Sequence, residues 1–107
     1  MRVLLDECVP RPLRREFPGH VVRTLREMGW AGKRNGELLA LMAGAGFEVL
    51  LTVDRSLPYQ QNLTAAGVAV VVMVAVSNRL PDLIPVVPAV EAALAGVQPG
   101  DAVEVRA

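Results

Sequence analysis

The stretch that decides the fold is Val3-Leu4-Leu5-Asp6-Glu7-Cys8. Three apolar residues of strand-forming type lead directly into two adjacent carboxylates. A short, wholly apolar run of this kind is typical of a strand buried on both faces, as in parallel sheets. Ligands of open α/β sheets bind at the carboxyl ends of such strands. The two acids are therefore either ligands at a functional edge or a polar exit from the core.

The same pattern returns further along the chain. Residues 47–53 form a second apolar run that ends in Asp54, and residues 68–76 form a third that ends in Ser77-Asn78-Arg79. Two shorter segments, 20–24 and 102–106, also have the composition of strands.

Helical patterns separate these strands. The segments 9–17 and 35–46 carry apolar residues at helical spacing, 60–67 begins with a polar turn of helix, and 81–95 has the pattern of a helix broken or offset by prolines. Glycine or proline ends each of them. Alternating strands and helices predict a single three-layer α/β domain over residues 1–107, with a mainly parallel sheet of four or five strands. The connections are long enough for right-handed crossovers.

Composition restricts the class of protein. The chain has 107 residues, 52% of them hydrophobic, with 11 acidic and 11 basic side chains, so it has no net charge that would attract a polyanion. One cysteine, Cys8, excludes an internal disulfide and suits a reducing compartment. The chain begins with a strand pattern rather than a signal peptide, and the apolar run 68–76 is well short of the roughly 20 residues that span a bilayer. We expect a cytoplasmic protein without membrane segments.

Basic residues nevertheless gather toward the amino-terminal half of the chain. Three of them, Arg11, Arg14 and Arg15, share the outer face of the predicted helix 9–17. They form either a solvated helix face or a phosphate-binding surface beside the acids. The remaining members of this group are Arg23, Arg26, Lys33, Arg34 and Arg55.

Acidic residues follow the strands in a way that suggests convergence. Asp6, Glu7 and Asp54 come directly after buried strands, and Glu37 lies in the first turn of a helix. Carboxylates gathered at one sheet edge repel one another unless a cation joins them. Oxygen ligands favour Mg²⁺ or Mn²⁺, ions that activate water and clamp phosphoryl groups. Each acid also has an ordinary structural explanation; for Glu37 it is stabilisation of a helix dipole by about 0.3–1 kcal/mol.

The order of these motifs resembles the small PIN-like proteins. Their amino terminus has an apolar strand, Asp-Glu-Asn and then proline, similar to residues 3–10 here. The similarity continues at Asn35-Gly36-Glu37-Leu38-Leu39 and at Leu51-Thr52-Val53-Asp54-Arg55. One subgroup of the family also resembles Pro58-Tyr59-Gln60-Gln61-Asn62-Leu63 and Ser77-Asn78-Arg79-Leu80.

The resemblance implies a PIN-like fold and a metal-dependent ribonuclease, often the toxin of a toxin–antitoxin pair. Asp6, Glu37 and Asp54 match the catalytic, metal-binding positions, and Glu7 is a fourth metal ligand or a supporting residue. Mg²⁺ or Mn²⁺ is the implied cofactor, and RNA the substrate. The residues expected to contact RNA are Arg11, Arg15, Arg55, Gln61, Asn62, Asn78 and Arg79, although caps and loop hydrogen bonds explain Gln61, Asn62, Asn78 and Arg79 equally well.

The chain departs from the family pattern at three places. Cys8 replaces the usual asparagine, Asn35 replaces an acid, and Arg55-Ser56-Leu57 replaces the usual basic residue-Asp-Phe. The smaller number of carboxylates weakens the case for a two-metal mechanism. The alternatives are a mechanism with a single metal ion and a non-catalytic module that binds RNA or a protein. An antitoxin is one candidate partner. A second copy of the chain is another, since the apolar helices 38–45 and 88–95 bury either in the core or in a homodimer.

Overall fold

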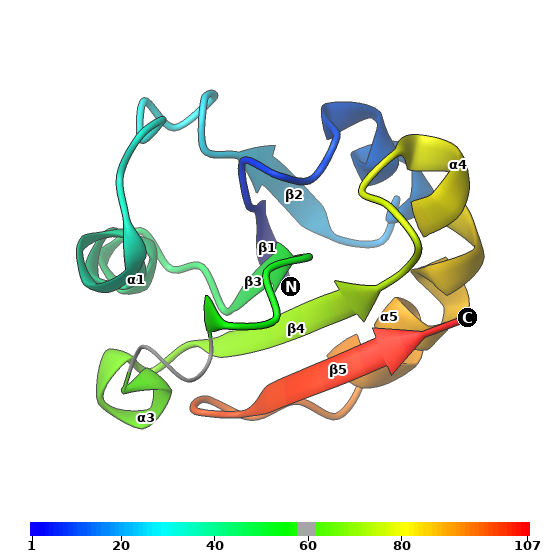
Figure 1. Cartoon of the computed structure of the whole chain (residues 1–107). Coiled ribbons are helices and arrows are strands. Elements are labelled where there is room, and N and C mark those ends of the chain that lie inside the picture. The colour runs from blue at the N-terminus through cyan, green and yellow to red at the C-terminus, as the bar shows by residue number, and fades with distance from the viewer. Residues whose placement is uncertain (58–61) are drawn as a thin grey trace.

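The computed structural model describes residues 1–57 and 62–107. Five strands form one sheet in the order β2-β1-β3-β4-β5, and every neighbouring pair is parallel (Figure 1). Their bounds are β1 Arg2–Leu5, β2 Val21–Thr24, β3 Val49–Thr52, β4 Ala69–Val74 and β5 Ala102–Arg106. The predicted α/β class is confirmed, and the sheet is parallel throughout.

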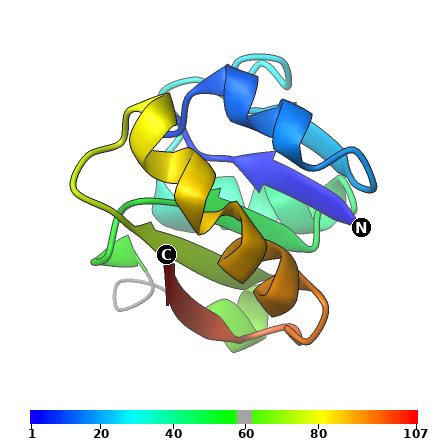
Figure 2. The same cartoon turned by 90° about the vertical axis from the view of Figure 1, so that its right-hand side faces the viewer.

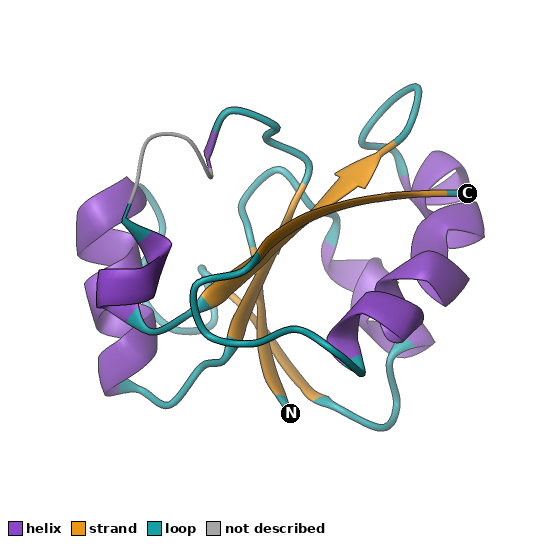
Figure 3. Ribbon diagram, turned by 90° about the horizontal axis from the view of Figure 1, so that it is seen from below, coloured by secondary structure: helices purple, strands orange, loops and turns teal. Residues whose placement is uncertain are grey.

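Helices cover both faces of the sheet and make the third layer. Figure 3 shows the two helical groups on either side of the strands. One face carries α1 (Asn35–Gly44) and α3 (Leu63–Ala66). The other carries the short 3₁₀ helices η1 (Arg11–Glu16) and η2 (Ile84–Val86) together with α4 (Leu80–Leu83) and α5 (Val87–Leu94).

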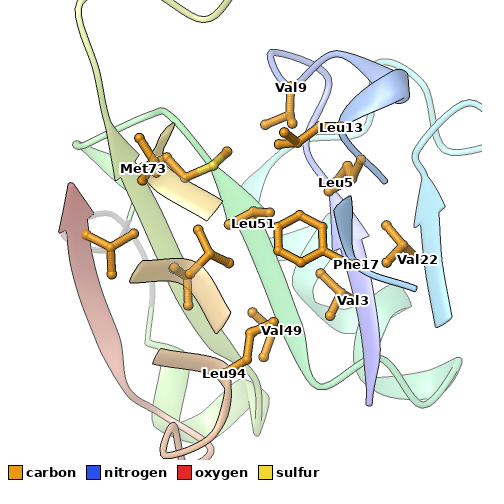
Figure 4. Close-up of a cluster of buried hydrophobic side chains, with 14 of the residues drawn as sticks. Val3, Leu5, Val9, Leu13, Phe17, Val22, Val49, Leu51, Met73 and Leu94 are labelled. Atoms are coloured by element: carbon orange, nitrogen blue, oxygen red, sulfur yellow. The ribbon is translucent and has the colours of Figure 1, made fainter. Parts of the chain in front are cut away.

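Two apolar clusters fill the space between the layers. Alternate side chains of each strand point to opposite faces, so Leu4 and Leu50 pack toward α1 whereas Leu5 and Leu51 pack toward η1 and α5 (Figure 4). These strands are buried on both faces, which explains their continuous apolar sequence. Each buried leucine contributes roughly 1.5–3 kcal/mol through removal of apolar surface from water.

The predicted helix 9–17 forms as a shorter 3₁₀ helix. Prolines at positions 10 and 12 lack the amide hydrogens that an α-helix would need, so regular structure is limited to Arg11–Glu16. The four-residue apolar spacing still predicts the buried side chains correctly, because Val9, Leu13 and Phe17 are at most 5% exposed.

One of the four connections between strands has the opposite hand to the others. The connections β3–β4 and β4–β5 step toward the same edge of the sheet, but α3 lies on one face and α4–α5 on the other (Figure 2). The β4–β5 crossover is therefore left-handed, whereas about 98% of such connections are right-handed. The expectation of right-handed crossovers is wrong at this one connection.

Hydrophobic burial explains the exception. α1 and α3 already cover one face of β3 and β4, while Val71 and Met73 point to the other. The short η1 lies nearer to β1, so this second face needs another cover. α5 supplies it through Val90 and Leu94, which are at most 4% exposed. The free energy gained by burying this apolar surface decides the path of the chain between β4 and β5.

The remaining expectations hold with small changes of boundary. α1 begins at Asn35, the first residue of the predicted helix 35–46, with Arg34 as N-cap, and ends two residues earlier than predicted, at Gly44. Gly67, with φ of 74°, ends α3 in the left-handed region. Core packing accounts for most of the apolar faces of residues 38–45 and 88–95: Leu38, Leu39, Met42, Val90 and Leu94 lie in the two clusters, whereas Leu41 is half-buried and lies in neither. None of the helices in residues 1–57 and 62–107 is long and apolar enough to cross a membrane.

Candidate functional site

The candidate site lies where the sheet topology changes direction. From β1 the chain proceeds to β2 on one side, and from β3 it proceeds to β4 on the other, although β1 and β3 are neighbours. Open α/β sheets bind their ligands in the crevice at such a point, beyond the carboxyl ends of the strands. Leu5 pairs with Leu51 in register. This pairing brings Asp6 level with Thr52.

Thr52 joins the two predicted acids. Its hydroxyl donates to Asp6 Oδ2 at 2.7 Å and accepts from the backbone N–H of Asp54 at 3.0 Å. Thr52 is the one fully buried polar residue in the part of the chain that the structure describes. A buried hydroxyl that is satisfied on both sides fixes its partners more firmly than an exposed one. Asp6 is therefore held in one orientation.

The turn after β1 completes the environment of Asp6. Its Oδ1 accepts from the backbone N–H of Glu7 at 2.8 Å, and the Cys8 sulfur lies 3.7 Å from Oδ2 and 3.6 Å from the Thr52 hydroxyl. Burial raises the pKa of the Cys8 thiol above its ordinary value, and the neighbouring Asp6 carboxylate adds to the shift. Cys8 is thus a neutral thiol at pH 7, which excludes a thiolate nucleophile.

Asp54 and Glu7 reach the same hollow from different segments. Asp54 Oδ1 accepts from the backbone N–H and the hydroxyl of Ser56, at 3.0 and 2.7 Å, which fixes the turn after β3. Glu7 Oε1 accepts from the N–H of Gly32, so the loop before α1 is tied to the end of β1.

A cavity of about 400 Å³ opens at this point. The residues that line it are Asp6, Glu7, Gly32, Lys33, Arg34, Leu38, Asp54 and Leu57. Three carboxylates and two cations thus share one hollow at the carboxyl edge of the sheet. A second cavity, of about 620 Å³, lies on the other side of Asp6 and Glu7 and extends to Arg11 and Arg26.

Glu37 stands apart from the other predicted acids. Its carboxylate pairs with Lys33 Nζ at 3.1 Å and is 61% exposed, and the residue does not line the 400 Å³ cavity. The i,i+4 pairing follows from the helical spacing of the two residues. In residues 1–57 and 62–107 no three histidine, cysteine or acidic side chains form a group that could hold a metal ion.

The acids that face the cavity suit a cation bound by only one or two protein ligands better than a cation fully enclosed by protein ligands. Mg²⁺ usually keeps several water ligands and takes one or two carboxylates from the protein, with substrate phosphate completing its shell. Asp6 and Asp54 satisfy that requirement because both line the hollow. A cluster of three carboxylates that includes Glu37 would form only if the ion pair between Lys33 and Glu37 were broken.

The predicted substrate residues divide into two groups. Arg11 lines the 620 Å³ cavity beside the acids, whereas Arg15 lies in a separate hollow further along η1. Arg55 does not reach toward the acids, because its guanidinium pairs with Glu104 of β5 at 3.1 and 3.3 Å.

The predicted amide contacts have structural roles in the described chain. Asn62 caps α3 by accepting from the N–H of Ala65 at 3.1 Å. Asn78 donates from Nδ2 to the carbonyl of Cys8 at 2.9 Å, so it supports the turn that carries Asp6. Arg79 is the N-cap residue of α4 and its backbone N–H bonds to Ser77 Oγ. Gln61 lies outside the described residues.

Sequence reasoning missed the residues that organise the site. Thr52 was placed in the strand motif without a role, and Lys33, Arg34 and Arg26 were noted only as part of a basic half. A hydroxyl residue that ends an otherwise apolar strand, two positions before an acid, is the signal that identifies Thr52. Comparison of the chain with models of protein families, with curated proteins and with solved structures finds no match.

Proposed function

We propose that the protein is a Mg²⁺- or Mn²⁺-dependent endoribonuclease that acts in the 400 Å³ cavity. The observation that carries the proposal is the lining of this hollow: Asp6, Glu7 and Asp54 share it with Lys33 and Arg34. Carboxylates that can bind a cation, beside side chains that can bind phosphate, are what phosphodiester hydrolysis requires. The position at the topological switch point supports the same site.

Each residue has a defined task in this proposal. Asp6 and Asp54 hold the cation, which when bound lowers the pKa of its water and neutralises charge on the phosphoryl oxygens. Thr52 keeps Asp6 oriented through its 2.7 Å hydrogen bond. Lys33 and Arg34 bind the phosphate on the helix side of the hollow, and Arg11 binds it on the η1 side. Glu7 ties the loop at Gly32 and so sets the width of the opening.

Cleavage of RNA tests the proposal. Wild-type protein incubated with Mg²⁺ or Mn²⁺ is expected to cut a single-stranded RNA, and a chelator is expected to stop it. Asp6→Asn and Asp54→Asn keep the size of the side chain but remove the charge, so both should abolish cleavage. Glu48→Gln is the matched control because Glu48 precedes β3 at the opposite, amino edge of the sheet. Equal cleavage by the four proteins would reject the assignment.

A non-catalytic module that binds RNA or a protein is the second candidate. The observation that favours it is the ion pair between Lys33 and Glu37, because the third predicted metal ligand, Glu37, binds a lysine in this structure. This alternative predicts binding without cleavage and no effect of divalent ions on stability. In the enzymatic case the toxin role implied by the PIN-like resemblance predicts growth inhibition on expression, relieved by Asp54→Asn and by a neighbouring antitoxin.

A further inference from the structure

The charges of this neutral chain are strongly segregated. Residues 11–34 contain seven arginines and lysines against two acids, Glu16 and Glu27, whereas the other 83 residues contain four against nine. The segment comprises η1, β2 and the loop to α1. Because β2 ends the sheet, all three lie along one edge (Figure 1). One edge of a protein without net charge is therefore strongly positive.

A hollow of about 360 Å³ lies on this edge between η1 and β2. It is lined by Arg14, Arg15 and Arg23, with His20 and the single acid Glu27. Arg14 is neutralised, because its guanidinium bonds to both carboxylate oxygens of Glu27 at 2.8 and 2.9 Å. Arg15 and Arg23 are exposed and form no ion pair with the described residues.

A hydrogen bond connects the lining of this hollow to that of a second cavity, which reaches the candidate active site. Glu27, which lines the hollow, also accepts from the backbone N–H of Thr24 at 3.0 Å. Thr24 in turn lines the 620 Å³ cavity together with Arg11 and Arg26, and that cavity shares Asp6 with the catalytic hollow. Three hollows thus lie between η1, β2 and the acids, and the two nearest the acids share Asp6 and Glu7.

The opposite edge has no such excess of positive charge. Glu104 of β5 holds both Arg55 and Arg106, at 3.1 and 3.6 Å, so the cations there are already paired. Asp101 precedes the same strand. A polyanion that enters the site would therefore be attracted along β2 rather than along β5.

We propose that the β2 edge, defined by Arg11, Arg15, Arg23 and Arg26, binds the sugar–phosphate backbone of a single-stranded polynucleotide and guides it into the acid hollow. The proposal rests on the proposed ribonuclease function and adds the path of the substrate. The hollows have volumes of about 360–620 Å³, the size that holds a small ligand and hence single nucleotides of a strand. The substrate extends from the scissile bond along one side of the molecule.

Binding measured without cleavage tests this path. Fluorescence anisotropy of a labelled RNA of about 12 nucleotides, in chelator, reports affinity at several salt concentrations. Each phosphate contact that is lost should reduce the slope of log affinity against log salt by about 0.7. Arg15→Gln and Arg23→Gln should each do so, and the double variant should bind at least about tenfold more weakly at low salt. Arg106→Gln is the charge-matched control on the β5 edge and should leave affinity within about twofold.

The outcomes separate this inference from the proposed function. Equal effects of Arg15→Gln and Arg106→Gln, or an unchanged salt slope in the double variant, overturn the β2 path even if RNA is cleaved. Binding of a duplex or of polyglutamate as tightly as single-stranded RNA overturns it too, since the surface would then be a general polyanion site. If the Arg15 and Arg23 variants bind RNA more weakly but the wild-type protein does not cleave it, the β2 path is retained and the proposed ribonuclease function is rejected. Melting temperatures equal to wild type verify that each variant is folded.

Discussion

The hydroxyl of Thr52 lies 2.7 Å from Oδ2 of Asp6 and donates to it, joining the ends of two neighbouring strands. The same oxygen accepts from the N–H of Asp54. Two acids that are 48 positions apart in sequence are therefore both hydrogen-bonded to one buried oxygen atom, Asp6 through its carboxylate and Asp54 through its backbone N–H. The geometry of the 400 Å³ hollow depends on this atom as well as on the carboxylates.

Replacement of Thr52 by valine keeps the shape of the side chain and removes the hydroxyl. The backbone N–H of Asp54 then loses its acceptor and Asp6 loses a donor, so we expect a loss of about 1–3 kcal/mol in the free energy of unfolding. Urea denaturation measures it. Thr52→Ser, which keeps the hydroxyl, should recover cleavage even though it loses a buried methyl group; equal cleavage by valine and serine variants would show that the hydroxyl has no positioning role.

Divalent ions should stabilise the folded protein. Binding only to the folded state adds about 2.7 kcal/mol when the ion is at 100 times its dissociation constant. Thermal unfolding in millimolar Mn²⁺ is therefore expected to show a higher melting temperature for wild type and Glu48→Gln, but not for Asp54→Asn. A melting temperature that Mn²⁺ leaves unchanged would favour the non-catalytic module.

The Arg14–Glu27 pair should make a small, pH-dependent contribution to stability. The guanidinium of Arg14 holds the pKa of the Glu27 carboxyl below its ordinary value of 4.5. A depressed pKa in the folded state stabilises the protein above the unfolded-state pKa, and this contribution is lost as the pH falls through the folded value. Partly exposed pairs of this kind contribute less than about 1 kcal/mol.

Glu27→Gln should accordingly be less stable than wild type at pH 7 and equal to it at strongly acidic pH. Chemical denaturation at both pH values measures the difference. Glu16→Gln removes an exposed glutamate from η1 and serves as control. A stability gap that persisted at acidic pH would mean that Glu27 acts through packing rather than charge.

The Cys8 thiol should react slowly in the folded protein. Burial raises its pKa, so little thiolate is present at pH 7 to attack an alkylating agent. Alkylation followed by mass spectrometry should be much slower than in urea. Asp6→Asn removes a neighbouring negative charge and should accelerate it modestly. Native and unfolded chains that reacted at the same rate would contradict the half-buried, neutral thiol.

Sequence patterns predicted the strands well because burial on both faces leaves a continuous apolar run. The runs ending at Asp6 and Asp54 also pointed to the candidate site, since parallel strands bring their carboxyl ends to one edge. The partner of each charged side chain could not be predicted in this way. Arg55 pairs with Glu104, which lies 49 residues later on a different strand, and only the fold brings them together.

Glu37 shows a second limit of sequence reasoning. Glu37 was predicted correctly to lie in the first turn of α1. The direction of its carboxylate, however, depends on which neighbouring side chain carries the opposite charge. Lys33, four positions earlier, lies on the same helical face and pairs with it. The motif that resembles the PIN-like family at this position therefore does not by itself bring a third carboxylate into the hollow.

The left-handed return from β4 to β5 has a consequence for how the protein comes apart. The segment 80–106 provides both the helical cover of Val71 and Met73 and the last strand of the sheet. Neither can leave alone without exposing the apolar surface that the other helps to enclose. We expect the amide hydrogens of α5 and β5 to exchange with solvent together, as one cooperative unit, while β1 and β3 with the Thr52 link stay protected until the whole domain unfolds.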